Sequence, residues 1–586
     1  MPGLNSKHLP WLLAMVMGAI GTFQYHLAQF TSGFDTFFGD RGDPRGIVAL
    51  CEHWYQALSG KAQLLSPGLF YPIKGTLGYS EFLLGFGIPY SVLRSAGLSM
   101  FSSLETVIIV LTFLNYLACF VLLYSVLRFH LLASCAGAML FAFSSPKFFQ
   151  LSHLQLQFVV CLPLIFIFVI VAVRQAATLN QKRAFGLLFL AGLAFNVQLL
   201  TAFYFGWFFA LWCFLFLLLV LILQSTRHFV FTLVRKYWPA LAAASVTFLI
   251  TAAPFMLVYL PRANESNWYT YLNVSEMIPE WWALLSMGDG NYLWGWMAPI
   301  VRPKPIPTYW GELTIGIGVL TSFAWIGMTV FAILIVVKNL RPYPVLAERQ
   351  NEHRISPRLG LLFLSLMILA TTIFYCLGIK YGDDASLWKV VYYLFPGAKA
   401  IRAMSRYVIF LTLPMAIAFA FALDYGIAQI ASQKMRLRKA VLIVALVLIS
   451  SIGVFEQFGV FKIGGTGFSK RIETAYLNAM AGKLSHDCAA FYVTVKPDEN
   501  HGAAEYQYDA MLIAVMTGVP TLNGSSSQFP PGWFGLYQVK DPAYEENVKK
   551  WIELNKINGQ VCRLELSPPV EAFESGQAGL NPFEPK

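Results

Sequence analysis

The chain has 586 residues, of which 57% are hydrophobic, 16% aromatic and only 12% charged, and its formal net charge is +11. A water-soluble protein carries about 25% charged residues, so this composition excludes an ordinary soluble enzyme. The apolar residues fall into blocks of about 20, the length that crosses a bilayer, and they predict a polytopic α-helical membrane protein.

Eleven such blocks are predicted to be transmembrane helices: 10–28, 104–127, 131–147, 157–173, 184–200, 203–223, 239–260, 313–337, 359–378, 407–425 and 440–457. The first block lacks a small-residue cleavage site and continues into HLAQFTSGFDTFF, so it is predicted to be a retained helix and not a signal peptide. A shorter segment, 79–93, contains Glu81, two glycines and a proline. It is predicted to lie in the membrane interface without crossing.

Lysine and arginine concentrate in four connections, 174–183, 227–236, 338–358 and 433–439. The positive-inside rule places these basic connections, and with them the N-terminus, in the cytoplasm. The net charge then reflects membrane topology and not nucleic-acid binding. Counting 79–93 as a span would move two of the basic connections to the outer side, so the eleven-span arrangement is preferred.

Five segments are therefore predicted on the outer side: 29–103, 146–157, 261–312, 379–406 and the tail 458–586. The tail has strand patterns at 488–495 and 560–566 and helix patterns at 505–518 and 542–555. Two domains follow, a transmembrane domain over 1–457 and a small extracytoplasmic α/β domain over 458–586. Cys488 and Cys562, the only cysteines of the tail, are predicted to form a disulfide in an oxidising compartment.

The stretch FGDRGDPRG (38–46) crowds four charges just after the first span. Asp43 precedes a proline, which predicts the start of a surface helix, PRGIVALCEHWYQAL, carrying Glu52 and His53. In one interpretation Asp40 and Asp43 do chemistry at the membrane surface. In the other, Asp43 only caps the helix and the two arginines are solvated among lipid headgroups.

Other features of the predicted outer segments favour the catalytic interpretation. Arg402 and Arg406, in LFPGAKAIRAMSRY, lie one helical turn apart at the mouth of a span and can grip a phosphate together. The loop 261–312 is rich in Trp and Tyr, which form membrane belts or sugar-stacking platforms. Glu52, His53, Glu81 and His153 are candidate substrate-binding residues on these segments.

The sequence contains no CxxC or HExxH spacing and no GxxxxGK[ST] motif. A zinc site and an ATP-driven pump are therefore not predicted. No cofactor is required by any motif, and a divalent cation, if one binds, would be held by Asp40 and Asp43 with waters.

The motifs GDRGDPRGIVALCEHWYQAL, FYP…GYSE, PGAKAIRAMSRY and DAMLIAVMTGVPTLNG…PPGW, in this order along the chain, resemble the GT-C superfamily of polyprenyl-phosphate-dependent membrane glycosyltransferases, and within it a bacterial group. The resemblance implies an enzyme of the bacterial inner membrane that works on the extracytoplasmic side. Its partners would be a lipid-linked sugar donor and a glycan, lipid or protein acceptor.

The resemblance also implies roles for individual residues. Asp43 matches the acid that acts as, or orients, the general base, with Asp40 as the nearby alternative, and Arg402 and Arg406 match the residues that bind the donor phosphate. Many relatives carry a second acid in the short outer loop between spans three and four. Here that loop reads PKFFQLSHLQLQ, with only His153, which argues against a metal chelated by two acidic loops.

Two other classes of function remain open at this point. A secondary transporter or flippase for lipid-linked or anionic solutes should place ionisable residues in the middle of its spans, whereas here the mid-span segments are almost free of charge. A non-catalytic envelope-assembly factor, working through its soluble tail, has no distinguishing motif.

Overall fold

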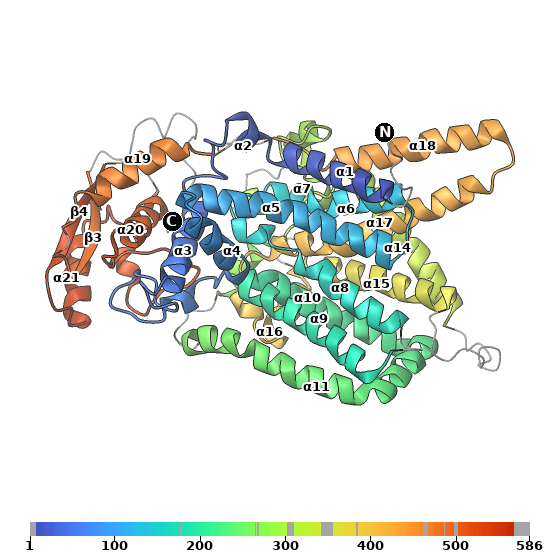
Figure 1. Cartoon of the computed structure of the whole chain (residues 1–586), viewed down its shortest axis with the longest axis horizontal. Coiled ribbons are helices and arrows are strands. Elements are labelled where there is room, and N and C mark those ends of the chain that lie inside the picture. Colours follow the sequence, from blue (N-terminus) through green and yellow to red (C-terminus); the bar gives the residue numbers. More distant parts are fainter. Residues whose placement is uncertain are drawn as a thin grey trace.

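We analysed a computed structural model that describes residues 8–175, 179–263, 265, 269–301, 310–340, 356–382, 385–460, 467–485, 487–496 and 502–567. The chain is mostly helical (Figure 1). Ten of the described helices are long and apolar enough to cross a membrane, and α1 (Leu9–Tyr25) is a shorter apolar helix. Together they confirm the predicted polytopic fold with about eleven spans.

The membrane-length helices form one bundle in which α6 and α17 are the most buried and α11 and α18 the least. In chain order the bundle contains α5 (Met100–Phe120, continued by a π-helical turn to Val126), α6 (Leu131–Ala142) with α7 (Ser145–Phe148), α8 (Cys161–Arg174), α9 (Gln181–Thr201), α10 (Phe203–Ile222), α11 (Gln224–Ala263), α14 (Val319–Lys338), α15 (Pro357–Leu377), α17 (Tyr407–Ala431) and α18 (Arg436–Phe455).

One predicted connection differs from the structure. The segment 227–236 is not a loop but the first part of α11, which kinks at Tyr237 (φ −111°, ψ 17°), two residues before Pro239. A proline removes a helical hydrogen bond and bends a helix. The basic segment therefore forms its own helical stretch ahead of the kink.

The first of the predicted outer segments, 29–103, with the residues just before it, contains α2 (Leu27–Thr31), α3 (Asp43–Leu58) and α4 (Leu84–Ser95). With 12 residues, α4 would be about 18 Å long, too short to cross about 30 Å of hydrocarbon. The other outer segments carry the short elements α12 (Tyr271–Ser275), α13 (Ala298–Val301), β1 (Lys380–Gly382), β2 (Ala385–Ser386) and α16 (Trp388–Leu394).

The described part of the tail, residues 467–567, is called the C-terminal unit below. It contains α19 (Lys470–Ala481), β3 (Ala490–Val495), α20 (Ala503–Thr517), α21 (Tyr544–Leu554) and β4 (Val561–Leu566). Strands β3 and β4 pair in parallel, with α20 and α21 in the crossover between them. Cys488 and Cys562 form a disulfide at this sheet.

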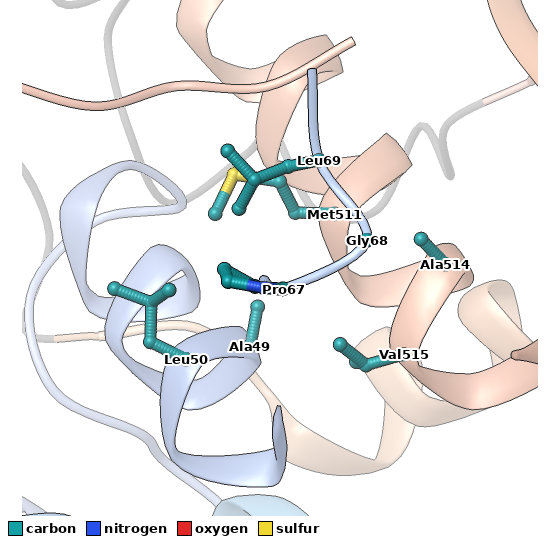
Figure 2. Close-up of a pocket in the computed structure, with 8 residues that line it drawn as sticks. All are labelled: Ala49, Leu50, Pro67, Gly68, Leu69, Met511, Ala514 and Val515. Carbon is teal, nitrogen blue, oxygen red and sulfur yellow. The ribbon is translucent and has the colours of Figure 1, made fainter. Parts of the chain in front are cut away.

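The C-terminal unit lies against the first outer segment (Figure 1). Backbone hydrogen bonds run from Tyr71 N to Thr521 O (2.9 Å) and from Thr521 N to Gly68 O (2.8 Å), and the Trp551 indole donates to Tyr71 O (2.8 Å). The seam also encloses a cavity of about 10 Å³ whose eight lining residues are apolar or glycine (Figure 2). It has room for about one water and is a packing gap, not a substrate site.

Candidate active site

All five predicted outer segments contribute a side chain to one cluster, which we call the outer-face cluster. Its members are Asp43 of the first outer segment, His153 of the short loop after α7, Glu312 of the long loop before α14, Arg406 at the start of α17 and Tyr508 on α20. Residues that are far apart in the sequence therefore meet at one end of the bundle.

Asp43 is the first residue of α3, and the N-cap position is taken by Gly42 with no side-chain capping bond. The backbone N–H of Gly42 instead donates to Asp40 Oδ1 (3.1 Å). The interpretation of Asp43 as a helix cap is therefore wrong. Its Oδ1 accepts a 2.5 Å hydrogen bond from the Tyr508 hydroxyl, its Oδ2 lies 2.7 Å from His153 Nδ1, and 44% of its side chain is exposed.

His153 links Asp43 to Glu312 and Arg406. Its Nε2 lies 2.8 Å from Glu312 Oε1. Arg406 donates to both oxygens of Glu312, from Nη2 (2.6 Å) and from Nε (3.1 Å), the two-pronged geometry that guanidinium and carboxylate favour. Gln150 donates to the Gly311 carbonyl (3.3 Å) and so fixes the Glu312 loop against the loop of His153.

The pKa values follow from this chain of contacts. Burial raises the pKa of Asp43, but His153 and Tyr508 outweigh burial and lower it to about 2. Burial and the Arg406 charge lower the pKa of His153, while Glu312 and Asp43 raise it to about 9 overall. Despite its burial, Glu312 has a lowered pKa because Arg406 and His153 are adjacent. At neutral pH the cluster thus holds two carboxylates, an imidazolium and a guanidinium.

Asp40 and Glu81 have a different environment. Burial, with a contribution from Asp43, raises the pKa of Asp40. Burial likewise raises the pKa of Glu81 to about 8, against the opposing charges of Arg406 and His153, and its Oε2 is a buried atom without a hydrogen-bond partner. Burial therefore favours the protonated form of Glu81, next to the outer-face cluster.

Arg402 lies beside the cluster on the same connection as Arg406. Its guanidinium is 5.5 Å from the centre of the Tyr269 ring, and its backbone N–H donates to the Tyr204 hydroxyl (3.1 Å). Arg406 in turn lies 5.5 Å from the centre of the Tyr204 ring. The sequence predicted that the two arginines share a helix face, but they do not, because residues 401–403 are irregular and α17 begins only at Tyr407. Both are set among tyrosines of the first turn of α10 and of the long loop before α14.

Two of the predicted substrate-binding residues lie elsewhere and have packing partners. Glu52 accepts from Arg94 through both oxygens (2.7 and 2.9 Å) and from the Tyr90 hydroxyl (2.5 Å), which ties α3 to α4. His53 is buried, with Nε2 3.0 Å from the Leu64 carbonyl oxygen. The structure brings together Asp43, His153 and Arg406, but not Glu52 and His53.

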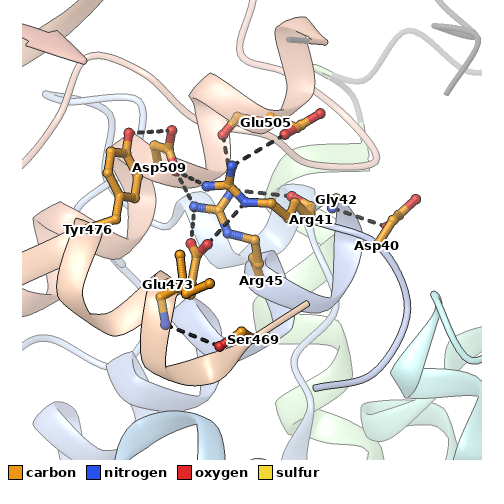
Figure 3. A network of polar contacts seen from close by, with 10 residues as sticks. Asp40, Arg41, Gly42, Arg45, Ser469, Glu473, Tyr476, Glu505 and Asp509 are labelled. Carbon is orange, nitrogen blue, oxygen red and sulfur yellow. Dashed lines mark hydrogen bonds and ion pairs between the residues drawn. The ribbon is translucent and has the colours of Figure 1, made fainter. Parts of the chain in front are cut away.

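One interpretation of the sequence placed the two arginines of the charged stretch in solvent among the lipid headgroups. The structure contradicts that interpretation. Arg41 and Arg45 are 7% and 0% exposed and enter the C-terminal unit (Figure 3). Arg45 Nη2 lies 2.6 Å from Glu473 and also pairs with Asp509, and Arg41 Nε lies 3.0 Å from Glu473. We call these residues, together with Glu505, 3.9 Å from Arg41, the arginine clamp.

Two members of the outer-face cluster, Glu312 and Tyr508, were not predicted from the sequence, although each has a weak signal there. Glu312 is the last acid of the long outer loop before a span, and Tyr508 lies within the predicted tail helix 505–518. Asp40 and Asp43 stay a prediction as ligands of a divalent cation, and one carboxylate oxygen of Asp43 already faces the His153 ring. Among the described residues no group of three or more His, Cys, Asp or Glu is arranged to hold a metal ion.

The raised pKa of His153 predicts a pH-dependent stability. Because the pKa is higher in the folded state, the stabilising contribution of the imidazolium is complete below about pH 6.5 and is lost as the pH rises through about 9. The apparent unfolding temperature of His153→Gln should fall furthest below that of the wild type at pH 6, and the gap should narrow at pH 9.5. A gap that stays constant over this range would contradict the double ion pair.

No family model matches the chain, and no curated protein sequence is significantly similar to it. Solved structures with a similar arrangement include the archaeal oligosaccharyltransferase AglB from Archaeoglobus fulgidus with an inhibitory peptide and a dolichol-phosphate (13% identity, TM-score 0.45, 93% of this chain and 68% of that one). Another is the arabinofuranosyltransferase AftD from Mycobacteria (13%, 0.49, 90% and 32%). A third is ArnT from Cupriavidus metallidurans bound to undecaprenyl phosphate (12%, 0.39, 88% and 84%).

The chain spans about a third of the length of AftD. At such identities and TM-scores the likenesses assign no activity, which has to be argued from the outer-face cluster itself.

Proposed function

We propose that the chain is a GT-C glycosyltransferase that moves a sugar from a polyprenyl-phosphate-linked donor to an extracytoplasmic acceptor. One observation carries the proposal. Asp43, a half-exposed carboxylate held by Tyr508 and His153, lies in one chain of contacts with Arg406 at the N-terminal end of the membrane-length helix α17. A base and a cationic site at this depth suit a donor whose phosphate lies at the membrane surface.

In the proposed reaction the acceptor oxygen forms a bond to the anomeric carbon while the bond from that carbon to the phosphate oxygen breaks. The acceptor proton passes to the Asp43 carboxylate, and the electron pair of the broken bond stays on the lipid phosphate. A positioned base contributes typically 10²–10⁴-fold to rate. Its low pKa keeps Asp43 ionised, and fixed cations stabilise the charge that develops on the leaving phosphate.

The two arginines are proposed to divide the donor site. Arg406 already has Nε and Nη2 on Glu312, so it supplies positive potential and holds the His153–Glu312 chain. Arg402, four residues earlier in the chain, makes the direct contact with the phosphate. Glu81, His153 and the loop tyrosines would line the sugar subsite between them.

Arg402→Ala should raise the KM for the lipid-linked sugar about 10-fold or more, since a hydrogen bond to a charged group contributes about 1.5–3 kcal/mol. Lysine at this position should restore binding only in part, because an ammonium lacks the planar fork. The measurement is KM with donor lipid enriched from cells lacking the chain. Lys549→Ala, which removes an exposed charge of α21, is the matched control, and an equal rise in both variants would contradict the assignment.

The membrane orientation is part of the proposal: N-terminus in the cytoplasm, C-terminal unit outside, and α4 on the outer surface. A membrane-impermeant maleimide added to intact spheroplasts should label Ala96→Cys, an exposed position after α4, and should not label Lys182→Cys, an exposed position in the first turn of α9. Labelling of position 182 but not 96 would place the outer-face cluster in the cytoplasm.

The transporter alternative has less support, because the described spans carry their charged residues at their ends: Asp424 near one end of α17, for example, and Glu105 in the first turns of α5. The proposal is tested in cells lacking this chain, whose lipid extracts should accumulate a polyprenyl-linked sugar by mass spectrometry. Returning the wild-type gene should remove it. Lipid extracts identical to those of the wild type would count against the proposal.

A further inference from the structure

The C-terminal unit reaches into the outer-face cluster through one side chain. We propose that Tyr508 of α20 is a positioning residue for Asp43, so that the C-terminal unit completes the active site; this inference rests on the proposed function. The hydroxyl of Tyr508 donates to Asp43 Oδ1 over 2.5 Å, while the other carboxylate oxygen faces His153. With both oxygens held from opposite partners, the plane of the carboxylate is fixed.

The tyrosine is itself held firmly. It is 8% exposed, and its ring packs on the first turn of α3, where a Cβ on Gly46 would lie only 2.6 Å from Tyr508 Cε1. Glycine at 46 is what lets the ring approach the helix backbone so closely. Burial also raises the pKa of Tyr508 well above its usual value, so the hydroxyl keeps its proton and remains a donor.

The arginine clamp fixes the position of α20 relative to α3 (Figure 3). Arg41 and Arg45 flank Asp43 by two residues on either side, and Asp509, which pairs with Arg45, is the neighbour of Tyr508 on α20. Tyr476 of α19 donates to the other oxygen of Asp509 (2.9 Å). The clamp thus places α20 so that Tyr508 points at Asp43, and the charged stretch serves both docking and chemistry.

Removing only the hydroxyl separates positioning from packing, because Tyr508→Phe keeps the ring against Gly46. We expect kcat to fall about 10-fold or more with the donor KM unchanged. The acidic limb of the pH–rate profile should shift to higher pH, since the lost hydrogen bond is one of the contacts that lower the pKa of Asp43. Tyr544→Phe is the matched control: its buried hydroxyl bonds Val493 O and the Asn523 side chain inside the C-terminal unit, so that variant should lose stability without moving the limb.

A second readout does not need activity. A water-soluble carbodiimide attacks protonated carboxyl groups, so peptide mass spectrometry should find Asp43 of Tyr508→Phe labelled several-fold more than in the wild type at pH 4. Unchanged labelling would overturn the positioning role, even if kcat fell. Increased labelling in a protein whose wild type transfers no sugar would uphold the role of Tyr508 and overturn the proposed function instead.

Discussion

Asp43→Asn is expected to reduce turnover about 10²-fold or more while leaving the donor KM within a few-fold of the wild type. The amide keeps the size and polarity of the side chain and can still accept the Tyr508 hydrogen bond, but it cannot take a proton. It also removes one of the two carboxylates that face His153, so the pKa of His153 should fall toward its usual range. The measurement is steady-state kinetics of the purified protein, with imidazole titration by NMR as the independent check.

Asp40→Asn is the control for this prediction. Asp40 lies three residues away, and its Oδ1 accepts a hydrogen bond from Gly42 N, which an asparagine carbonyl can also accept. Its turnover should stay close to that of the wild type. The opposite pattern, an inactive Asp40→Asn and an active Asp43→Asn, would assign the base to Asp40.

Arg45→Met is expected to cost about 3–5 kcal/mol in the free energy of unfolding, the usual result of breaking a buried ion pair from one side. Glu473 and Asp509, 1% exposed each, would keep only Arg41 as a cationic partner in the clamp. Since the clamp joins α3 to α19 and α20, the C-terminal unit should become sensitive to a protease added to purified protein. Unfolding temperature and proteolysis rate are the measurements.

An exposed ion pair on α21 serves as the control for Arg45→Met. Lys550 and Glu546 on α21 lie 2.6 Å apart with more than 60% of each side chain exposed, and such pairs contribute little. Lys550→Met should therefore leave both measurements unchanged. If Arg45→Met behaved like Lys550→Met, the clamp would not be what holds the unit in place.

The membrane architecture could be predicted from the sequence because hydrocarbon thickness sets the length of each apolar block. The strands at 490–495 and 561–566 and the helices α20 and α21 were also predicted, since their patterns are local. The helix α19 was not predicted, although Ser469 caps it, because its buried face includes the charged residues Lys470 and Glu473 beside Tyr476, Leu477 and Met480.

Contacts between distant segments could not be predicted in the same way. The motif DRGDPR contains two sets of charges with different destinations: Asp43 faces the outer-face cluster, whereas Arg41 and Arg45 are buried in the C-terminal unit. Charges near a span look the same in the sequence whether they are solvated or paired, as Arg41 is, with a residue 432 positions later. Arg41 and Arg45 are buried because Glu473 and Asp509 pair with them, and only the fold brings these carboxylates next to the arginines.

The central claim is that this chain cleaves the bond between a sugar and a polyprenyl phosphate, with Asp43 as the base. The most direct measurement supplies the purified protein in detergent with lipid extract from cells lacking the chain and with envelope extract as the source of acceptor. Mass spectrometry then follows the free polyprenyl phosphate. Wild-type protein should release it and Asp43→Asn should release about 10²-fold less. No release by the wild type, as a flippase would give, or equal release by the two proteins, would contradict the account.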